Sequence, residues 1–113
     1  MPTNTFKDLI VWQKAKNLAV KIYRLTGSFP RTESYGLSSQ MQRSAVSISS
    51  NIAESYHRRS KKDKDKFISI AFGSGSELES QIEIAKELYP VLEYKEAENL
   101  LVETQKILNK FLH

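Results

Sequence analysis

The sequence predicts an all-α protein, an up-down-up-down antiparallel four-helix bundle formed by residues 1–113 as a single domain. The chain has only 4 glycines and 3 prolines in 113 residues, so long stretches lack helix breakers. Four segments have apolar residues three and four positions apart, the periodicity of an amphipathic helix. Short connections separate these segments, and short connections join antiparallel neighbours in helical bundles.

The first helix is expected from Thr5 to about Thr26. Thr5, with Asp8 three residues later, is a helix-capping arrangement. Gly27 and Pro30 end the helix, because glycine suits the position after the last turn and proline cannot continue the hydrogen-bond ladder. One broad face is apolar and comprises Val11, Trp12, Ala15, Leu18, Ala19, Ile22, Tyr23 and Leu25. The other side is a basic stripe, either solvated or facing a polyanion, of Lys7, Lys14, Lys21 and Arg24.

The second helix begins at Leu37 and has two stripes. Its apolar stripe consists of Leu37, Met41, Ala45, Ile48, Ile52 and Tyr56. Six serines between Ser38 and Ser50 lower the helix propensity, so tertiary packing must compensate. A polar stripe consists of Gln40, Arg43, Ser47, Asn51, Glu54 and Arg58. This polar stripe has three interpretations: a solvent-exposed face, a hydrogen-bonded seam between helices or subunits, or a ligand site.

The third helix is expected to begin at Lys61, because Ser60 is a suitable N-cap. Its nearly heptad apolar pattern comprises Phe67, Ala71, Ser74, Leu78, Ile82, Ala85 and Tyr89. Gly73 and Gly75 each cost on the order of 1 kcal/mol relative to alanine in a helix, so a close contact is expected at both. Pro90 stops this helix. A fourth amphipathic helix, from about Lys95 to Leu112, has Ala97, Leu100, Leu101, Thr104, Ile107, Leu108 and Phe111 on its apolar face.

Composition excludes several classes of protein. No cysteine is present, so disulfides and thiolate metal sites are excluded. The first residues do not have the pattern of a secretory signal, and no apolar run approaches the roughly 20 residues of a membrane helix, so we expect a cytoplasmic protein without a membrane partner. Neither His57 nor His113 has a visible catalytic partner, and the Glu-x-x-His pairs of bundle metal sites are missing. The sequence therefore predicts a non-enzymatic protein with no cofactor or metal.

Positive charge is concentrated in one segment. Residues 1–60 contain nine Lys and Arg against three acids, whereas residues 61–113 contain eight against ten. A basic cluster between the second and third helices consists of Arg58, Arg59, Lys61, Lys62, Lys64 and Lys66. Such a cluster is either a solvated connection or a site for the phosphates of a nucleic acid. Base stacking is not indicated, because only Tyr56 and Phe67 flank the cluster and Phe67 belongs to the core pattern.

Three segments carry a resemblance to a known family: FKDLIVWQKA, SQMQRSAVSISSNIAE and FISIAFGSGSELE. The chain resembles the four-helix-bundle proteins associated with intervening sequences in bacterial 23S ribosomal RNA, which are related in fold to the accessory variability protein of diversity-generating retroelements. The resemblance implies a homo-oligomeric ring, commonly a pentamer, with a basic surface. The family's recurring polar positions, which suit a packed seam or an oligomer interface, correspond to Ser47, Asn51, Glu54, Ser74 and Glu77.

The sequence departs from the family pattern near the end of the second helix. Family members often have proline near Ser49 and glycine near Ser55 and His57. Without those residues the second helix is expected to extend further into the basic segment.

Two functions follow from these observations. The first is an oligomeric protein that binds structured RNA or RNA–DNA, with Lys14, Lys21 and Arg24 adding to the basic cluster around a ring. The second is a protein-interaction scaffold that recruits a partner, such as a reverse transcriptase, without touching nucleic acid.

Overall fold

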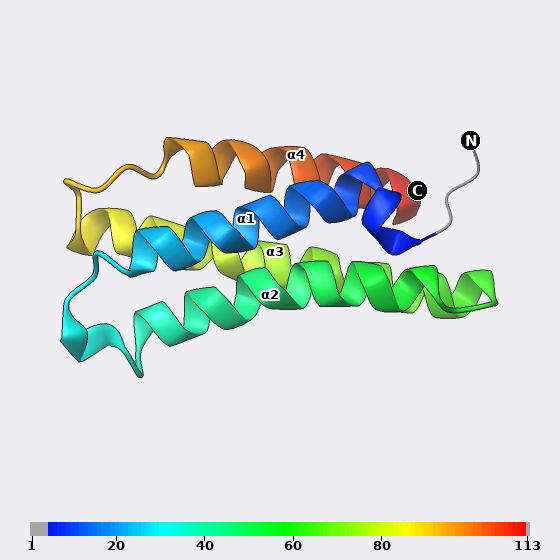
Figure 1. Cartoon of the computed structure of the whole chain (residues 1–113), viewed down its shortest axis with the longest axis horizontal. Coiled ribbons are helices and arrows are strands. Elements are labelled where there is room, and N and C mark those ends of the chain that lie inside the picture. The colour runs from blue at the N-terminus through cyan, green and yellow to red at the C-terminus, as the bar shows by residue number, and fades with distance from the viewer. Residues whose placement is uncertain (1–4, 113) are drawn as a thin grey trace.

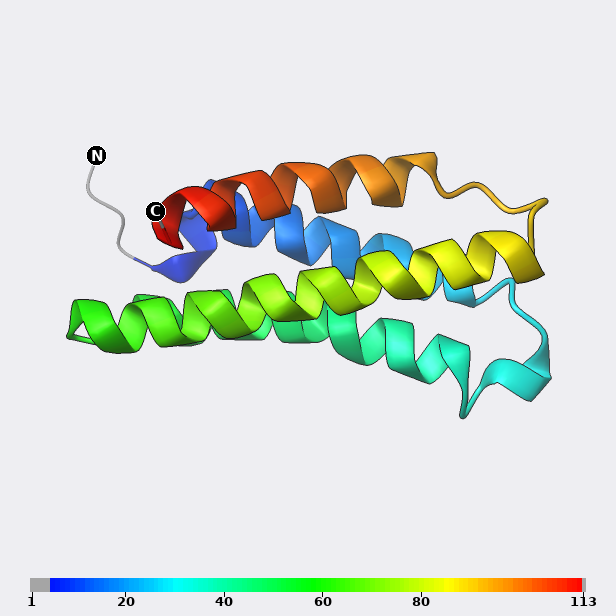
Figure 2. The same ribbon diagram turned by 180° about the vertical axis from the view of Figure 1, so that it is seen from behind.

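The fold is a bundle of four antiparallel α-helices, seen in a computed structural model that describes residues 5–112 (Figure 1). The helices are α1 (Ile10–Thr26), α2 (Leu37–Tyr56), α3 (Lys61–Leu88) and α4 (Lys95–Leu112). Two short 3-10 helices, η1 (Phe6–Asp8) and η2 (Arg31–Glu33), precede α1 and α2. Each helix packs against its neighbours in the chain, and α4 returns beside α1 to close the bundle (Figure 2). The predicted up-down-up-down architecture is confirmed.

The core lies along the bundle axis and receives apolar side chains from all four helices. The largest fully buried side chains are Leu18, Ile22, Met41, Ile48, Ile52, Leu78, Ile82, Thr104 and Leu108. Burying a Leu, Ile or Met side chain stabilises a fold by roughly 1.5–3 kcal/mol relative to leaving it exposed. The predicted apolar stripes therefore account for most of the interior. Phe67 is an exception: it is only half-buried, and its neighbour Ile68 enters the core instead.

The start of the first helix differs from the prediction. Thr5 does cap a helical turn, because its Oγ1 accepts a hydrogen bond from the Lys7 amide at 3.3 Å, but that turn is η1. Leu9 then has an extended backbone, with φ −72° and ψ 127°, so α1 begins only at Ile10. This break places the Phe6 ring against Trp12, with centroids 5.1 Å apart. A ring contact between η1 and α1 thus replaces the continuous helix that the capping pattern predicted.

The two glycines of α3 have different surroundings. A Cβ on Gly75 would overlap the carboxamide of Gln105 from α4, which donates a hydrogen bond to the Phe72 carbonyl at 3.0 Å. The expected close contact is confirmed there. Nothing among the described residues lies within 4 Å of a Cβ added to Gly73, so the same expectation was wrong for Gly73.

This difference predicts opposite responses to alanine. Gly73→Ala should stabilise the protein by about 0.5–1 kcal/mol, because alanine is the better helix former and meets no neighbour. Gly75→Ala should lose that gain, because displacing Gln105 breaks a hydrogen bond worth about 0.5–1.5 kcal/mol. Urea unfolding of the two variants measures the difference. Equal stabilisation by both substitutions would contradict the packing of Gln105 over Gly75.

Candidate nucleic-acid interface

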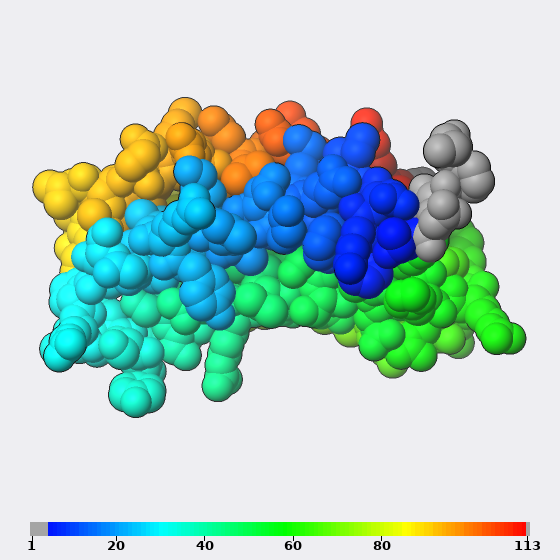
Figure 3. Space-filling view, in the orientation of Figure 1, coloured from blue at the N-terminus to red at the C-terminus, as the bar shows by residue number. Residues whose placement is uncertain are grey.

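The basic cluster lies on a hairpin that projects from one end of the bundle. We call residues 56–66, the end of α2, the connection and the first turns of α3, the hairpin tip. Both ribbon views show the tip, in green, extending past the nearby ends of α1 and α4 (Figures 1 and 2). The space-filling view shows the same projection at the green end of the molecule (Figure 3). Side chains at the tip can therefore meet a large ligand without hindrance from the other two helices.

The connection between α2 and α3 is short and defined by caps. Helix α2 ends at Tyr56, where the His57 amide donates to the Glu54 carbonyl at 3.2 Å. The expectation that α2 extends into the basic segment was therefore wrong. Ser60 caps α3 as predicted, because its Oγ accepts a hydrogen bond from the Asp63 amide at 3.1 Å. The chain thus turns back between the two helices within four residues, 57–60.

Two polar side chains hold the helices of the tip together. The buried Ser55 hydroxyl donates to the Lys64 carbonyl of α3 at 3.0 Å. In return, the Lys64 ammonium donates to the carbonyls of Ser55 and Tyr56, at 3.4 and 3.3 Å. These carbonyls belong to the last turn of α2, where a cation is favourable because the helix end carries partial negative charge. Lys64, a predicted site residue, therefore also has a structural role within the tip.

The other basic residues of the tip are exposed, and they differ in their partners. Arg58 pairs with Glu54 at 3.3 Å, and Lys61 pairs with Asp65 at 2.6 Å. Arg59, Lys62 and Lys66 have no ion pair with any described residue. Residues 57–66 contain six of the 17 Lys and Arg residues and two of the 13 Asp and Glu residues, so the remaining chain has eleven of each. The whole net charge of +4 is thus equal to the excess at the tip.

Two lysines of the basic stripe predicted on the first helix, Lys14 and Lys21, pair with α4 and do not join the tip. The Lys14 ammonium pairs with Glu103 of α4 at 2.7 Å, and Lys21 pairs with Glu96 of α4. The hydrogen bond from Lys21 lowers the pKa of Glu96, which keeps this carboxylate charged to a lower pH than usual. Lys7 lies on η1, outside α1, and Arg24 is exposed near the opposite end. Lys14 and Lys21 therefore cross-link α1 to α4 and have carboxylates close to their charges.

The polar stripe of α2 divides into a central seam and exposed ends. The hydroxyls of Ser47 and Ser74 are 2.8 Å apart and join α2 to α3. Asn51 donates to the carbonyl and hydroxyl of Ser47, at 2.8 and 3.1 Å. The Ser47–Ser74 pair is thus a hydrogen bond between helices, whereas the hydrogen bonds of Asn51 stay within α2. The remaining members of the predicted set are exposed at the surface: Gln40, Arg43, Glu54, Arg58 and Glu77.

Aromatic side chains gather at the tip, and only Tyr56 and Phe67 among them were identified from the sequence. Phe6 contacts Trp12 and His57 edge to face, with ring centroids 5.1 and 5.9 Å apart. Tyr56 and His57 are in edge-to-face contact at 5.3 Å. The predicted topology could have indicated this aromatic group. In an antiparallel bundle, the first residues of the first helix and the last residues of the second helix lie at the same end of the bundle. These four rings form an aromatic group beside the basic cluster, and Phe67 contacts Arg58 and Lys66 of that cluster.

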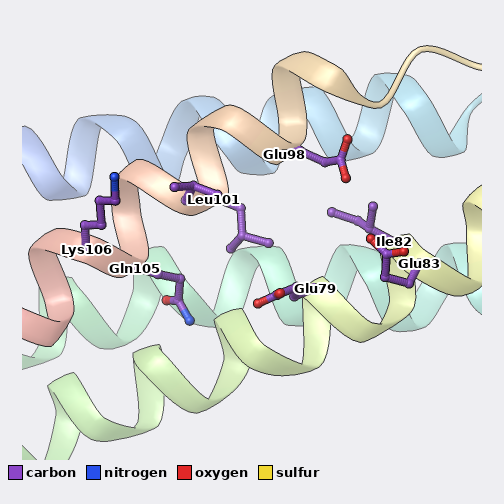
Figure 4. Close-up of a pocket in the computed structure, with 8 residues that line it drawn as sticks. Glu79, Ile82, Glu83, Glu98, Leu101, Gln105 and Lys106 are labelled. Atoms are coloured by element: carbon purple, nitrogen blue, oxygen red, sulfur yellow. The ribbon is translucent and has the colours of Figure 1, made fainter.

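Two hollows lie on the surface, with opposite chemical character. One, of about 270 Å³, lies beside the tip, and its lining includes Ile52, Tyr56, Lys61, Ile68 and Phe111. The other, of about 260 Å³, lies between α3 and α4 (Figure 4). Ile82 and Leu101 form its apolar part, and its charged lining residues are Glu79, Glu83, Glu98 and Lys106. Lys86 also pairs with Glu83 and Glu98. The carboxylates of this acidic groove outnumber its cations, whereas the tip has a net positive charge, so the tip is the better surface for a polyanion.

No metal-binding arrangement accompanies this surface within residues 5–112. In that range no group of three or more His, Asp or Glu side chains could hold a metal ion. His57 contacts aromatic rings at the tip, and His113 lies outside the described residues. Among the described helices, none is long and apolar enough to cross a membrane.

The fold and the tip define a class: a small four-helix bundle that presents a basic, aromatic hairpin at one end. A match to the 23S rRNA-intervening sequence protein family extends over residues 7–110, and the chain belongs to this family. A crystal structure of a protein of unknown function from the S23 ribosomal protein family of Bacteroides thetaiotaomicron is similar, with a TM-score of 0.80 and 25% sequence identity. The similarity covers 91% of this chain and 98% of that chain. No curated protein matches the chain.

Proposed function

We propose that this protein binds nucleic acid, structured RNA or an RNA–DNA intermediate, through the hairpin tip. The observation that carries the proposal is the charge distribution: the tip holds an excess equal to the entire net charge, on a projecting surface. Arg59, Lys62 and Lys66 are the primary phosphate contacts, because they are exposed and have no ion pair with a described residue. The proposal includes no catalytic step.

The local electrostatics support phosphate binding at this end. The N-terminus of α3 lies within the tip, and its unsatisfied amides carry partial positive charge that adds to the lysines. Arg58 and Lys61 are paired only with exposed carboxylates, and such surface pairs contribute at most about 1 kcal/mol. A phosphate can therefore compete for both side chains. Lys14 and Lys21 are secondary contacts, because a phosphate must displace the α4 carboxylates from them.

A mobility-shift titration with a structured RNA tests the proposal. Binding should be largely independent of sequence, because phosphate contacts carry no sequence information. Affinity should fall by on the order of a hundredfold or more between about 50 and about 200 mM salt, as counterions replace the tip contacts. Absence of any shift at about 50 mM salt would refute nucleic-acid binding.

We further propose that the protein assembles into the pentameric ring that family resemblance implies. Exposed apolar side chains on α3 and α4, Ile70, Ile84 and Val102, offer surface for contacts between copies. A ring would present several tips to one nucleic acid and raise the avidity. Light scattering on a sizing column should give about five times the 13.0 kDa of one chain. A mass of one chain would refute the ring, and with it the binding of one nucleic acid by several tips.

The acidic groove favours a second candidate function, a protein-interaction scaffold. Its apolar floor and its rim of Glu79, Glu83 and Glu98 suit a partner segment with basic and apolar residues. A pull-down with and without nuclease separates the two functions. A scaffold retains its protein partner after the nucleic acid is digested, whereas a nucleic-acid-binding protein loses partners held through the nucleic acid.

A further inference from the structure

We infer that the hairpin tip recognises unpaired bases, so that its ligand is a single strand or the loop of a folded RNA rather than a continuous duplex. This inference rests on the proposed function and narrows its ligand. It follows from the aromatic side chains that the fold brings to the basic cluster. Phosphate contacts position a nucleic acid, and the flat faces of unstacked bases pack on aromatic rings or guanidinium planes.

Rings from three elements meet at the tip. Phe6 comes from η1, Trp12 from α1, and His57 from the connection after α2. Phe6 contacts both other rings edge to face, at interplanar angles of 72° to Trp12 and 78° to His57. Edge-to-face contacts bring several ring faces close together without stacking them on one another. His57 is the exposed member of this group, and it directly precedes Arg58 and Arg59.

Cations lie over the aromatic faces in the same region. The Arg58 guanidinium carbon is 4.6 Å from the centroid of the Phe67 ring, and the Lys66 ammonium is 5.6 Å from it. On α1, the Lys16 ammonium is 5.9 Å from the centroid of the Trp12 ring. Alternating cations and rings is the arrangement that single-strand binding proteins use, with cations for the backbone and rings for successive bases.

Packing within the chain does not account for all these rings. The contact of Phe6 with Trp12 secures η1 against the bundle, which is a structural role. Phe67, in contrast, lies outside the core, and Ile68 occupies the buried position beside it. His57 is exposed although its ring contacts two others. Phe67 and His57 are therefore the side chains with which a base would stack.

The hollow beside the tip fits the same ligand. Its volume of about 270 Å³ is below the roughly 300–1,000 Å³ of sites for drug-sized molecules. Apolar side chains, among them Ile52 and Ile68, line it together with Lys61, Lys64 and Asp65, the carboxylate that pairs with Lys61. A flat apolar group attached to a phosphate matches this combination. In a duplex the bases are stacked and paired, so neither the hollow nor the rings could reach their faces.

The experiment compares three ligands with the full chain: a short oligouridine, an abasic strand of equal length, and a blunt duplex of equal length. Trp12 is the only tryptophan, and it contacts the aromatic group, so its fluorescence reports the approach of a base. We expect the oligouridine to quench Trp12 and to bind about tenfold more tightly than the abasic strand. Equal affinity for all three ligands, with steep salt dependence, would overturn this inference and leave the proposed function standing. Failure of every ligand to bind at about 50 mM salt would overturn both.

Variants assign the effect to the rings. The double variant His57→Ala, Phe67→Ala should bind oligouridine about tenfold more weakly and bind the abasic strand as before. His57→Phe with Phe67→Tyr should restore the affinity, because it keeps two flat rings. Tyr35→Ala removes a fully exposed ring at the opposite end and is the matched control. If the double variant keeps its preference for oligouridine over the abasic strand, the rings do not contact bases. Unfolding midpoints of all variants establish that the fold is intact.

Discussion

Replacing Arg59, Lys62 and Lys66 by alanine is expected to lower the affinity for structured RNA by on the order of a hundredfold at about 0.1 M salt. Each of these exposed cations contributes one counterion-releasing phosphate contact, so the slope of log affinity against log salt should fall by about 2–3. The substitutions should leave the fold intact, because none of the three forms an ion pair with a described residue. Fluorescence anisotropy over a range of salt concentrations measures both quantities.

A control with equal loss of charge separates a local site from a general effect. Arg31→Ala, Arg43→Ala and Lys95→Ala remove three exposed cations, none of which forms an ion pair with a described residue, from the half of the bundle opposite the tip. This triple variant should keep most of the affinity and nearly the same salt slope. If the two triple variants lose affinity equally, the net charge of the chain, and not the hairpin tip, is responsible for binding.

Ile48→Ala is expected to destabilise the protein by about 2–5 kcal/mol, the largest effect on stability that we predict. Ile48 is fully buried in the middle of α2, where it faces the core. Its truncation loses the burial of several carbon atoms and leaves a cavity between packed helices. Because a domain of this size has only about 5–15 kcal/mol of stability, the loss is a large fraction of the total. Thermal and urea unfolding followed by circular dichroism measure it.

Val46→Ala provides the matched control for this prediction. Val46 lies two residues before Ile48 on the same helix, but 40% of its surface is exposed. Its truncation should change the stability by no more than about 0.5 kcal/mol. A similar loss for Val46 and Ile48 would mean that the apolar stripe of α2 does not face the core as described.

The helices were the most predictable part of this protein. The second helix was expected to begin at Leu37, the third at Lys61, and the fourth from about Lys95 to Leu112, and the structure has these bounds. Ser60 illustrates why: a capping residue satisfies backbone groups within a few positions, so its role is readable locally. Apolar periodicity is equally local, since it depends only on 3.6 residues per turn. The bundle follows once four such faces must be buried together.

The candidate site was only partly predictable. The basic residues of the tip were identified, because charge is visible in the sequence. Their relation to the aromatic rings was not, because Phe6 and His57 are far apart in the chain and meet only through packing. Phe67 was wrongly assigned to the core, because Ala71 lies four residues after Phe67 and three after Ile68, and both spacings suit a helical face. The ion pairs of Lys14 and Lys21 depend on the facing position of α4.

The sequence by itself determined the four amphipathic helices, their order and the single basic segment, because each depends on residues close together in the chain. Tertiary structure alone decided where that segment points and what surrounds it. The α2–α3 hairpin projects beyond α1 and α4 because α3 has 28 residues, whereas α1 has 17 and α4 has 18. The break at Leu9 lets Phe6 contact both Trp12 and His57. These contacts join residues that are distant in sequence. They depend on how the helices pack against one another, which no local sequence pattern encodes.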